Sequence, residues 1–183
     1  MSAKTNKAIR HAAIAGIWSL VFIIPTFILE AMKKEVVTMN LKVTTLIFYI
    51  ITLVVYILFI RGFVVIAKKT KDKLLLTMSY LCIITTILYY IYVAFVTISP
   101  ALEKTFIHVF SLMVMGGVSI PFGISIINLK KKFKGIATAA GVLNIITGSF
   151  FITIIFVFLG FFTMIATYIL EIILLFRASE KLK

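Results

Sequence analysis

Long uncharged stretches are the feature of this sequence that most limits how it can fold. From Gly135 to Phe176 the only charged residue is Glu171, and further uncharged stretches lie between clusters of lysine and arginine. A helix needs about 20 apolar residues to cross the hydrocarbon core of a bilayer. A hydrophobic content of 62% in 183 residues is more than a small soluble domain buries, because its surface-to-volume ratio is high. The sequence therefore predicts an all-α, polytopic transmembrane helical bundle.

The charged clusters divide the chain into six predicted spans. The stretch that begins at Gly135 is too long for a single crossing, so we expect a helical hairpin that turns near Phe156. The whole chain, residues 1–183, is expected to form a single transmembrane domain. Its predicted spans are residues 11–29, 43–62, 74–98, 106–127, 136–154 and 158–176.

The basic residues predict how these spans are oriented. Of the 19 lysines and arginines, 15 fall on the side of the N-terminus, and the other four are Lys33, Lys34, Lys42 and Lys104. Cytoplasmic loops of membrane proteins carry such an excess. We therefore expect both termini to be cytoplasmic, in a prokaryotic cell membrane, with anionic lipid headgroups as partners of the basic face. The net charge of +13 is spread over helix ends without a nucleic-acid motif, so no nucleic-acid partner is expected.

Small and polar residues form stripes on the last two predicted spans. Helices in lipid associate where small residues let their backbones approach closely. An antiparallel hairpin turning near Phe156 would bring residues whose numbers sum to about 311 to equal depth. The stripes, at helical spacings of three and four, are Ala137, Gly141, Asn144 and Gly148, and Gly160, Thr163, Thr167 and Glu171. The expected neighbours are Gly141 with Glu171, Asn144 with Thr167, and Gly148 with Thr163.

Glu171 is a charged residue that the sequence places inside a predicted span. It precedes Arg177 by six residues, which is about 9 Å of helical rise. Ionisable groups at such depth face the bundle interior, pair with one another or line a wet cavity. We expect Arg61, at a similar depth, to be the partner of Glu171, in a structural ion pair or at a proton or cation site. The candidate intramembrane polar site is Glu171, Arg61, Asn144, Thr167 and Thr163.

Motifs for other chemistry are missing from the sequence. The chain has two histidines, the single cysteine Cys82 and six carboxylates, without a metal-ligand spacing, a phosphate-binding loop or a nucleophile elbow. We therefore expect no catalytic, cofactor-binding or metal-binding residues, no cofactor and no enzyme activity. Tyr89 and Tyr92 share a helix face, which fits an aromatic girdle at the membrane interface or, alternatively, a ligand-stacking vestibule.

Two segments resemble small uncharacterised prokaryotic multi-span membrane proteins with six helices. The segments are Ser119-Ile120-Pro121-Phe122-Gly123-Ile124, which precedes the lysine-rich residues 130–134, and Tyr168-Ile169-Leu170-Glu171-Ile172-Ile173-Leu174-Leu175-Phe176. The resemblance implies the topology and no activity.

Two functional interpretations follow from these patterns. The packing stripes favour a structural, accessory or assembly component of the membrane, which would form a homo-oligomer or bind a membrane partner protein. The alternative is a small transporter or channel that uses Glu171 and its threonine- and asparagine-lined face as a proton or cation site.

Overall fold

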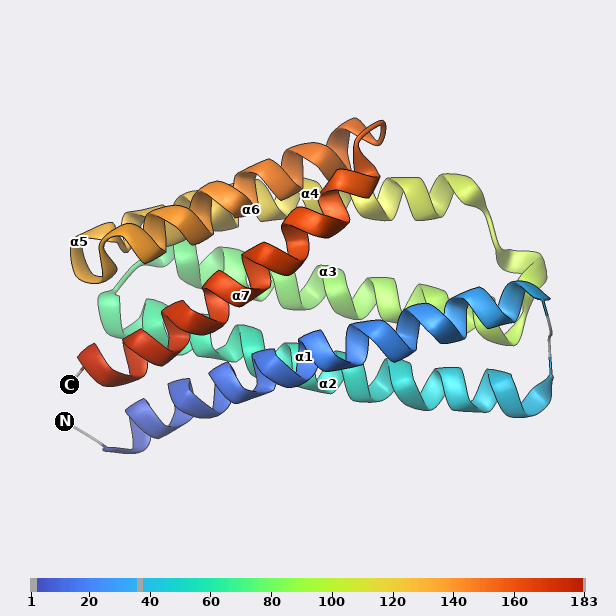
Figure 1. Cartoon of the computed structure of the whole chain (residues 1–183), viewed down its shortest axis with the longest axis horizontal. Coiled ribbons are helices and arrows are strands. Elements are labelled where there is room, and N and C mark those ends of the chain that lie inside the picture. The colour runs from blue at the N-terminus through green and yellow to red at the C-terminus, as the bar shows by residue number, and fades with distance from the viewer. Residues whose placement is uncertain (1–2, 36–37, 183) are drawn as a thin grey trace.

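A computed structural model describes residues 3–35 and 38–182 as an all-helical bundle (Figure 1). Lys183 and the side chains of Lys4, Lys33 and Lys34 lie outside the described part. Within it, six helices are long and apolar enough to span a membrane, as predicted. They are α1 (Ala3–Glu35), α2 (Met39–Thr70), α3 (Lys73–Ile98), α4 (Thr105–Asn128), α6 (Gly135–Thr153) and α7 (Val157–Lys181). A short 3-10 helix, η1 (Pro100–Leu102), and the single-turn α5 (Lys130–Phe133) lie in the connections.

The sharp reversal between α2 and α3 is set by local hydrogen bonds. Lys71 ends α2 in the left-handed conformation, with φ of 57°, and its backbone N–H donates to the Ala67 carbonyl. Asp72 then caps α3, because its side chain accepts a hydrogen bond of 3.0 Å from the backbone N–H of Leu75. Both caps provide hydrogen-bond partners for backbone groups that a helix end leaves without them.

The six long helices form a closed ring in chain order. Each packs against the next, α1 on α2, α2 on α3, α3 on α4, α4 on α6 and α6 on α7, and α7 returns to pack against α1. The axis of the bundle is therefore surrounded by all six.

The two ends of the bundle differ in charge. Both chain termini, the α2–α3 connection and α5 lie at one end, and the α1–α2 and α3–α4 connections lie at the other (Figure 1). We call the first the basic end; its lysines include Lys69 and Lys132, which are near enough for their charges to interact. Lys69 also donates a hydrogen bond to the Leu182 carbonyl there. The predicted gathering of basic helix ends is confirmed.

Glycines hold α4 and α6 in backbone contact. A Cβ atom added to Gly116 would lie 2.6 Å from the Gly148 carbonyl oxygen, and one on Gly123 would lie 2.5 Å from the Gly141 oxygen. Such an approach is possible only where neither helix carries a side chain. The small-residue stripes of these spans are therefore used for packing within the chain.

The contact at the turn of α6 and α7 agrees with the predicted register, whereas the polar side chains deeper in the bundle meet partners about one turn away from the predicted ones. Gly160 packs against Phe151, a pair that sums to 311. Farther in, Asn144 meets Glu171 instead of Thr167, and Thr167 meets Thr147. The physical reason is that side chains lean toward the N-terminus of their own helix. In two antiparallel helices the leans are opposite, so the ends of two side chains meet when their Cα atoms differ in depth by about one helical turn.

Candidate functional site

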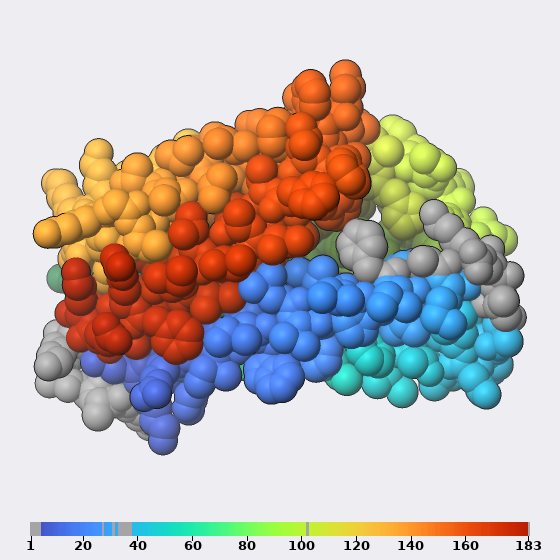
Figure 2. Space-filling model, viewed as in Figure 1, coloured from blue at the N-terminus to red at the C-terminus, as the bar shows by residue number. Residues whose placement is uncertain are grey.

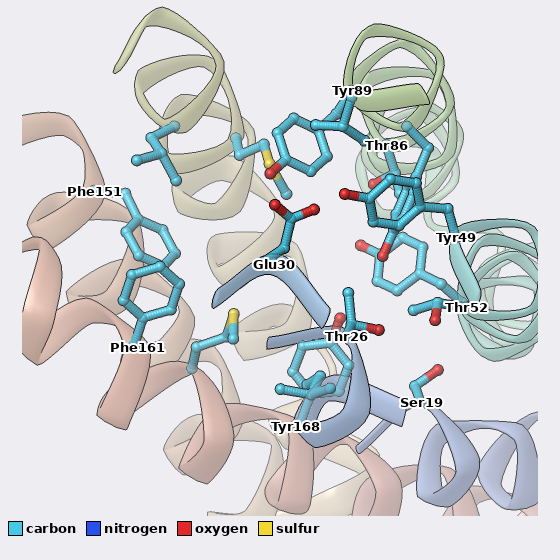
Figure 3. A pocket seen from close by; sticks show the side chains of 17 residues that line it. Ser19, Thr26, Glu30, Tyr49, Thr52, Thr86, Tyr89, Phe151, Phe161 and Tyr168 are labelled. Carbon is cyan, nitrogen blue, oxygen red and sulfur yellow. The ribbon is translucent and has the colours of Figure 1, made fainter. Parts of the chain in front are cut away.

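A cavity of about 280 Å³ lies inside the ring and is lined by residues of all six long helices (Figure 3). Apolar atoms make up most of the lining, and its polar groups are of three kinds. The described lining contains five tyrosines, four hydroxyl-bearing residues and one carboxylate. These residues are Tyr49, Tyr56, Tyr89, Tyr90 and Tyr168; Ser19, Thr26, Thr52 and Thr86; and Glu30.

The cavity occupies the half of the bundle away from the basic end. On α1 the lining begins at Ser19, whereas the buried core occupies positions 9 to 15 of the same helix. On α3 the lining begins at Thr86, whereas the core ends at Cys82. The same separation by depth holds on α2, α4 and α7. The cavity is therefore closed toward the basic end by a packed apolar core.

Aromatic rings form the floor of the cavity. The Tyr168 ring stacks on Phe59 with centroids 5.4 Å apart and lies 6.4 Å from the Tyr56 ring. Below them, Phe59 meets Phe63 edge to face at 5.8 Å, and Phe63 meets Phe122 at 5.3 Å. Aromatic rings in these edge-to-face and stacked arrangements pack closely.

Glu30 places a carboxylate in the part of the cavity that is farther from the basic end. Figure 3 shows its carboxylate directed into the space between α1 and α3, near the Tyr89 ring. The charge acts electrostatically on both Tyr89 and Tyr90. Tyr90 in turn meets Tyr49 edge to face, with centroids 5.7 Å apart. Glu30 is the one carboxylate in the described lining, which contains no lysine, arginine or histidine.

Ser19 presents a polar group to the part of the cavity that is nearer the basic end. Its side chain is 3% exposed, and its hydroxyl oxygen has no hydrogen-bond partner. The neighbouring hydroxyls of Thr26 and Thr52 donate to carbonyls four residues earlier in their own helices. A buried hydroxyl without a partner costs free energy comparable to a lost hydrogen bond, unless water or a ligand satisfies it.

The cavity was missed by the sequence analysis, although one signal for it exists. Ser19, Ile23, Thr26 and Glu30 are spaced by four, three and four residues, which places them on one helix face. The first predicted span, residues 11–29, ends one residue before Glu30. In the structure α1 continues to Glu35, so the carboxylate remains on the inward face.

At the end of the bundle away from the basic end, α4 extends beyond α6. The contacts Gly116–Gly148 and Gly123–Gly141 set the register of α4 and α6, so the last residue of α6, Thr153, is level with Ser111. The first six residues of α4 therefore extend about 9 Å beyond α6. Among the described residues, α1 and α4 do not pack against each other. Figure 2 shows the molecular surface hollowed between α1, α4 and α7.

A buried polar layer lies between α6 and α7. Glu171 is 3% exposed, and its Oε1 accepts a hydrogen bond of 2.7 Å from the Asn144 Nδ2. The Thr147 and Thr167 hydroxyls are 3.2 Å apart in the same interface. Glu171 is not part of the cavity lining, but its charge acts on Tyr56 and Tyr168 in the floor. The structure thus brings Asn144, Thr167 and Glu171 together directly below the cavity.

Arg61 and Thr163 do not join this layer. Arg61 is exposed, and no ion pair links it to Glu171 in the part of the chain that the structure describes. The predicted pair is therefore wrong. The reason is that the next residue, Gly62, faces α1 and α7, which turns Arg61 about 100° away from the interior. The Thr163 hydroxyl donates to the Leu159 and Gly160 carbonyls of its own helix.

Tyr92 and His108 belong to the surface of the opposite end. The Tyr92 hydroxyl exchanges long hydrogen bonds with the Lys104 backbone, at 3.4 and 3.5 Å, and its ring meets His108 at 5.1 Å. The predicted vestibule of Tyr89 and Tyr92 is thus replaced by a cavity that contains Tyr89 and Tyr90. Among the described residues, no three histidine, cysteine or acidic side chains are grouped to hold a metal ion.

No protein-family model, no curated protein and no solved structure matches this chain.

Proposed function

We propose that this protein is a small membrane transporter whose central cavity is the substrate site. The observation that supports this most directly is the cavity itself, enclosed by all six long helices and furnished with a carboxylate, tyrosines and hydroxyls. Binding sites in helical bundles are formed in this way, by a few polar groups in a mostly apolar pocket between helices.

Transport by alternating access fits the geometry better than a channel. An aromatic floor and a packed core separate the cavity from the basic end. A channel needs a continuous polar path, whereas a transporter exposes one site to each side in turn. The floor of Tyr56, Phe59 and Tyr168 is the part that would have to rearrange.

The charge distribution supports an orientation with the basic end in the cytoplasm. Lysines and arginines concentrate on the cytoplasmic side of membrane proteins, where they also attract anionic lipid headgroups. In this orientation, in a prokaryotic cell membrane, the cavity lies toward the outside and Glu171 lies below its floor. Glu171 would act as the proton or cation site that couples movement of the floor to a gradient, with Asn144 holding its carboxylate.

An accessory or assembly role is the second interpretation, and the packing of the glycines within this chain makes it less well supported than transport. It depended on small-residue stripes that would bind another chain. Gly116, Gly123, Gly141 and Gly148 are all in contact within this chain, between α4 and α6. They are therefore not left as a surface for a homo-oligomer or a membrane partner protein.

A cysteine-accessibility experiment tests transport without requiring knowledge of the substrate. Cys82 is the only cysteine, so Cys82→Ala gives a cysteine-free background in which Thr86→Cys places one thiol in the cavity. In sealed vesicles, an impermeant thiol reagent is added from one side or the other. Alternating access predicts labelling of Thr86→Cys from both sides.

Two single-cysteine controls define the sides. Ser99→Cys marks the opposite end, and Lys71→Cys marks the basic end, so each should react from one side only. If Thr86→Cys reacts only from the side of Ser99→Cys under every condition, the cavity does not alternate and the transporter proposal is wrong. That result would favour a binding or accessory role.

A further inference from the structure

We infer that the part of the cavity nearer the basic end binds an uncharged, mainly apolar molecule through a hydrogen bond between its hydroxyl or carbonyl group and Ser19. This inference rests on the proposed function in that it treats the cavity as the substrate site. It adds the chemical class of the substrate and makes Ser19 the residue that recognises its polar group.

Ser19 differs from serines elsewhere in the spans. The hydroxyls of Ser79, Ser111 and Ser149 each donate to the carbonyl four residues earlier in their own helix, at 2.7, 2.8 and 2.8 Å. The Ser19 hydroxyl oxygen is buried without a partner, although the side chain lines the cavity. Figure 3 shows this hydroxyl pointing toward Thr52 on α2. A buried hydroxyl that its own helix leaves unpaired is available to a bound molecule.

The position of Ser19 is beside the aromatic floor. Gly16, one turn earlier on α1, packs against Phe59, which is the ring on which Tyr168 stacks. The side chains of α1 are described at every position from 5 to 26. Apart from Glu30, the described lining contains no carboxylate, ammonium, guanidinium or imidazole group. The surroundings of Ser19 therefore offer hydroxyls, aromatic rings and apolar groups.

Neither Glu30 nor Glu171 is a partner of Ser19. Glu30 is 11 residues farther along α1, which corresponds to about 16 Å of helical rise. Glu171 is 3% exposed, lies outside the lining and accepts a hydrogen bond from Asn144. A charged group at Ser19 would lose its hydration without gaining an opposite charge in the lining, which is costly. A hydroxyl or carbonyl group needs only a hydrogen bond, which a serine hydroxyl supplies.

The volume of the cavity indicates the size of the molecule. An apolar cavity of about 150 Å³ holds one benzene molecule. The cavity of about 280 Å³ is roughly twice as large, which corresponds to about a dozen non-hydrogen atoms. The rings of Tyr56 and Tyr168 stand at the end near Ser19, and aromatic rings pack well against other rings. The inferred ligand is therefore a neutral alcohol or ketone with an apolar, preferably aromatic, body of this size.

Two probes of the same size test the inference, because 1-naphthol carries a hydroxyl where 1-methylnaphthalene carries a methyl group. Binding of each to the purified protein in dodecylmaltoside is measured by equilibrium dialysis, with protein-free micelles as the blank for partition. We expect saturable binding of both. Ser19→Ala should weaken binding of 1-naphthol by about threefold to 10-fold, because one neutral hydrogen bond is lost, and should leave the affinity for 1-methylnaphthalene unchanged.

Controls separate recognition from folding and from charge. Ser79→Ala removes a buried hydroxyl outside the cavity and should leave both affinities unchanged. The charged probes 1-naphthylmethylammonium and 1-naphthoate should bind about tenfold more weakly than 1-naphthol, because their charge must lose its hydration. Variants are compared only if their thermal unfolding matches that of the wild type. Ser19→Cys, whose thiol is a weak donor, replaces Ser19→Ala if that variant fails this criterion and should show the same selective loss.

The outcomes distinguish the ligand class from the transport proposal. An equal effect of Ser19→Ala on both neutral probes, as expected if only water satisfies the hydroxyl, overturns the inference. The absence of saturable 1-naphthol binding also overturns it, as does a charged probe that binds at least as tightly as 1-naphthol, even if Thr86→Cys is labelled from both sides. A selective loss in Ser19→Ala with one-sided labelling of Thr86→Cys supports the ligand class and overturns transport.

Discussion

Replacing one of two adjacent glycines on α4 should separate packing from helix propensity. A Cβ on Gly116 would lie 2.6 Å from the Gly148 oxygen, 3.0 Å from the Phe151 Cβ and 3.1 Å from the Ile152 Cγ1. A Cβ on Gly117 would meet nothing within 4 Å. Both substitutions to alanine gain the same helix propensity, about 1 kcal/mol, so this contribution cancels when the two variants are compared.

The size of the difference follows from the clash. Ordinary contact begins near 3.4 Å, so α4 and α6 must separate by about 0.8 Å to accommodate the new methyl group. A gap of this size removes a quarter to a half of the attraction between the atoms on either side. Overpacked cores of this kind lose about 1–3 kcal/mol. We therefore expect Gly116→Ala to be less stable than Gly117→Ala by about 1–3 kcal/mol.

Equilibrium unfolding in mixed micelles of dodecylmaltoside and SDS, followed by far-ultraviolet circular dichroism, measures this difference. Gly123→Ala is a second test at the same interface, because its Cβ would lie 2.5 Å from the Gly141 oxygen. Equal stability of Gly116→Ala and Gly117→Ala would show that the backbones of α4 and α6 are not in contact, and the assigned register would be wrong.

Two further predictions concern the reversal between α2 and α3 and use the same unfolding measurement. Lys71→Gly should stabilise the protein by about 0.5–1 kcal/mol, because lysine at φ 57° is disfavoured and glycine is not; a loss of stability would contradict the left-handed cap. Asp72→Ala should destabilise it by about 1 kcal/mol and Asp72→Asn much less, because asparagine can still accept from the Leu75 N–H; equal losses would mean that the cap does not form.

The spans could be predicted from the sequence because the hydrocarbon of the bilayer restricts which residues a membrane-spanning helix can contain. Only uncharged stretches of sufficient length can lie in hydrocarbon, and the charges between them mark the ends. Hydropathy nevertheless shows where the apolar region ends and not where the helix ends. Glu30 illustrates the difference, since α1 continues past it to Glu35 and keeps its carboxylate on the inward face.

The candidate site was harder to predict, because the depth of a residue in the membrane does not determine whether its side chain points into the bundle or outward. Arg61 and Glu171 were paired on their expected depth alone, but Arg61 is exposed while Glu171 is buried. Which face of a helix points inward depends on its neighbours, here on Gly62 packing against Ala12 of α1. Asn144 lies in the predicted interface but bonds to Glu171 instead of Thr167, because side chains lean toward the N-terminus of their own helix.

Variants of Glu171 and Asn144 test whether the layer below the cavity is only structural. The Asn144 Nδ2 donates to Glu171 and also to the Ala140 carbonyl at 3.1 Å. Asn144→Leu strands a buried carboxylate and should cost about 1–3 kcal/mol. Glu171→Leu leaves Asn144 with the Ala140 carbonyl and should cost less. The double Leu variant should return close to the wild-type stability, because an apolar pair replaces both polar groups.

Glu171→Gln addresses function, because its amide oxygen can still accept from Asn144 and the fold should be kept. Labelling of Thr86→Cys in sealed vesicles is measured with and without a pH gradient. If Glu171 is the coupling site, the Gln variant should keep the labelling of Thr86→Cys from the side of Ser99→Cys and lose the gradient-dependent labelling from the side of Lys71→Cys, because an amide does not take up a proton. Wild-type dependence on the gradient in Glu171→Gln would limit this residue to packing.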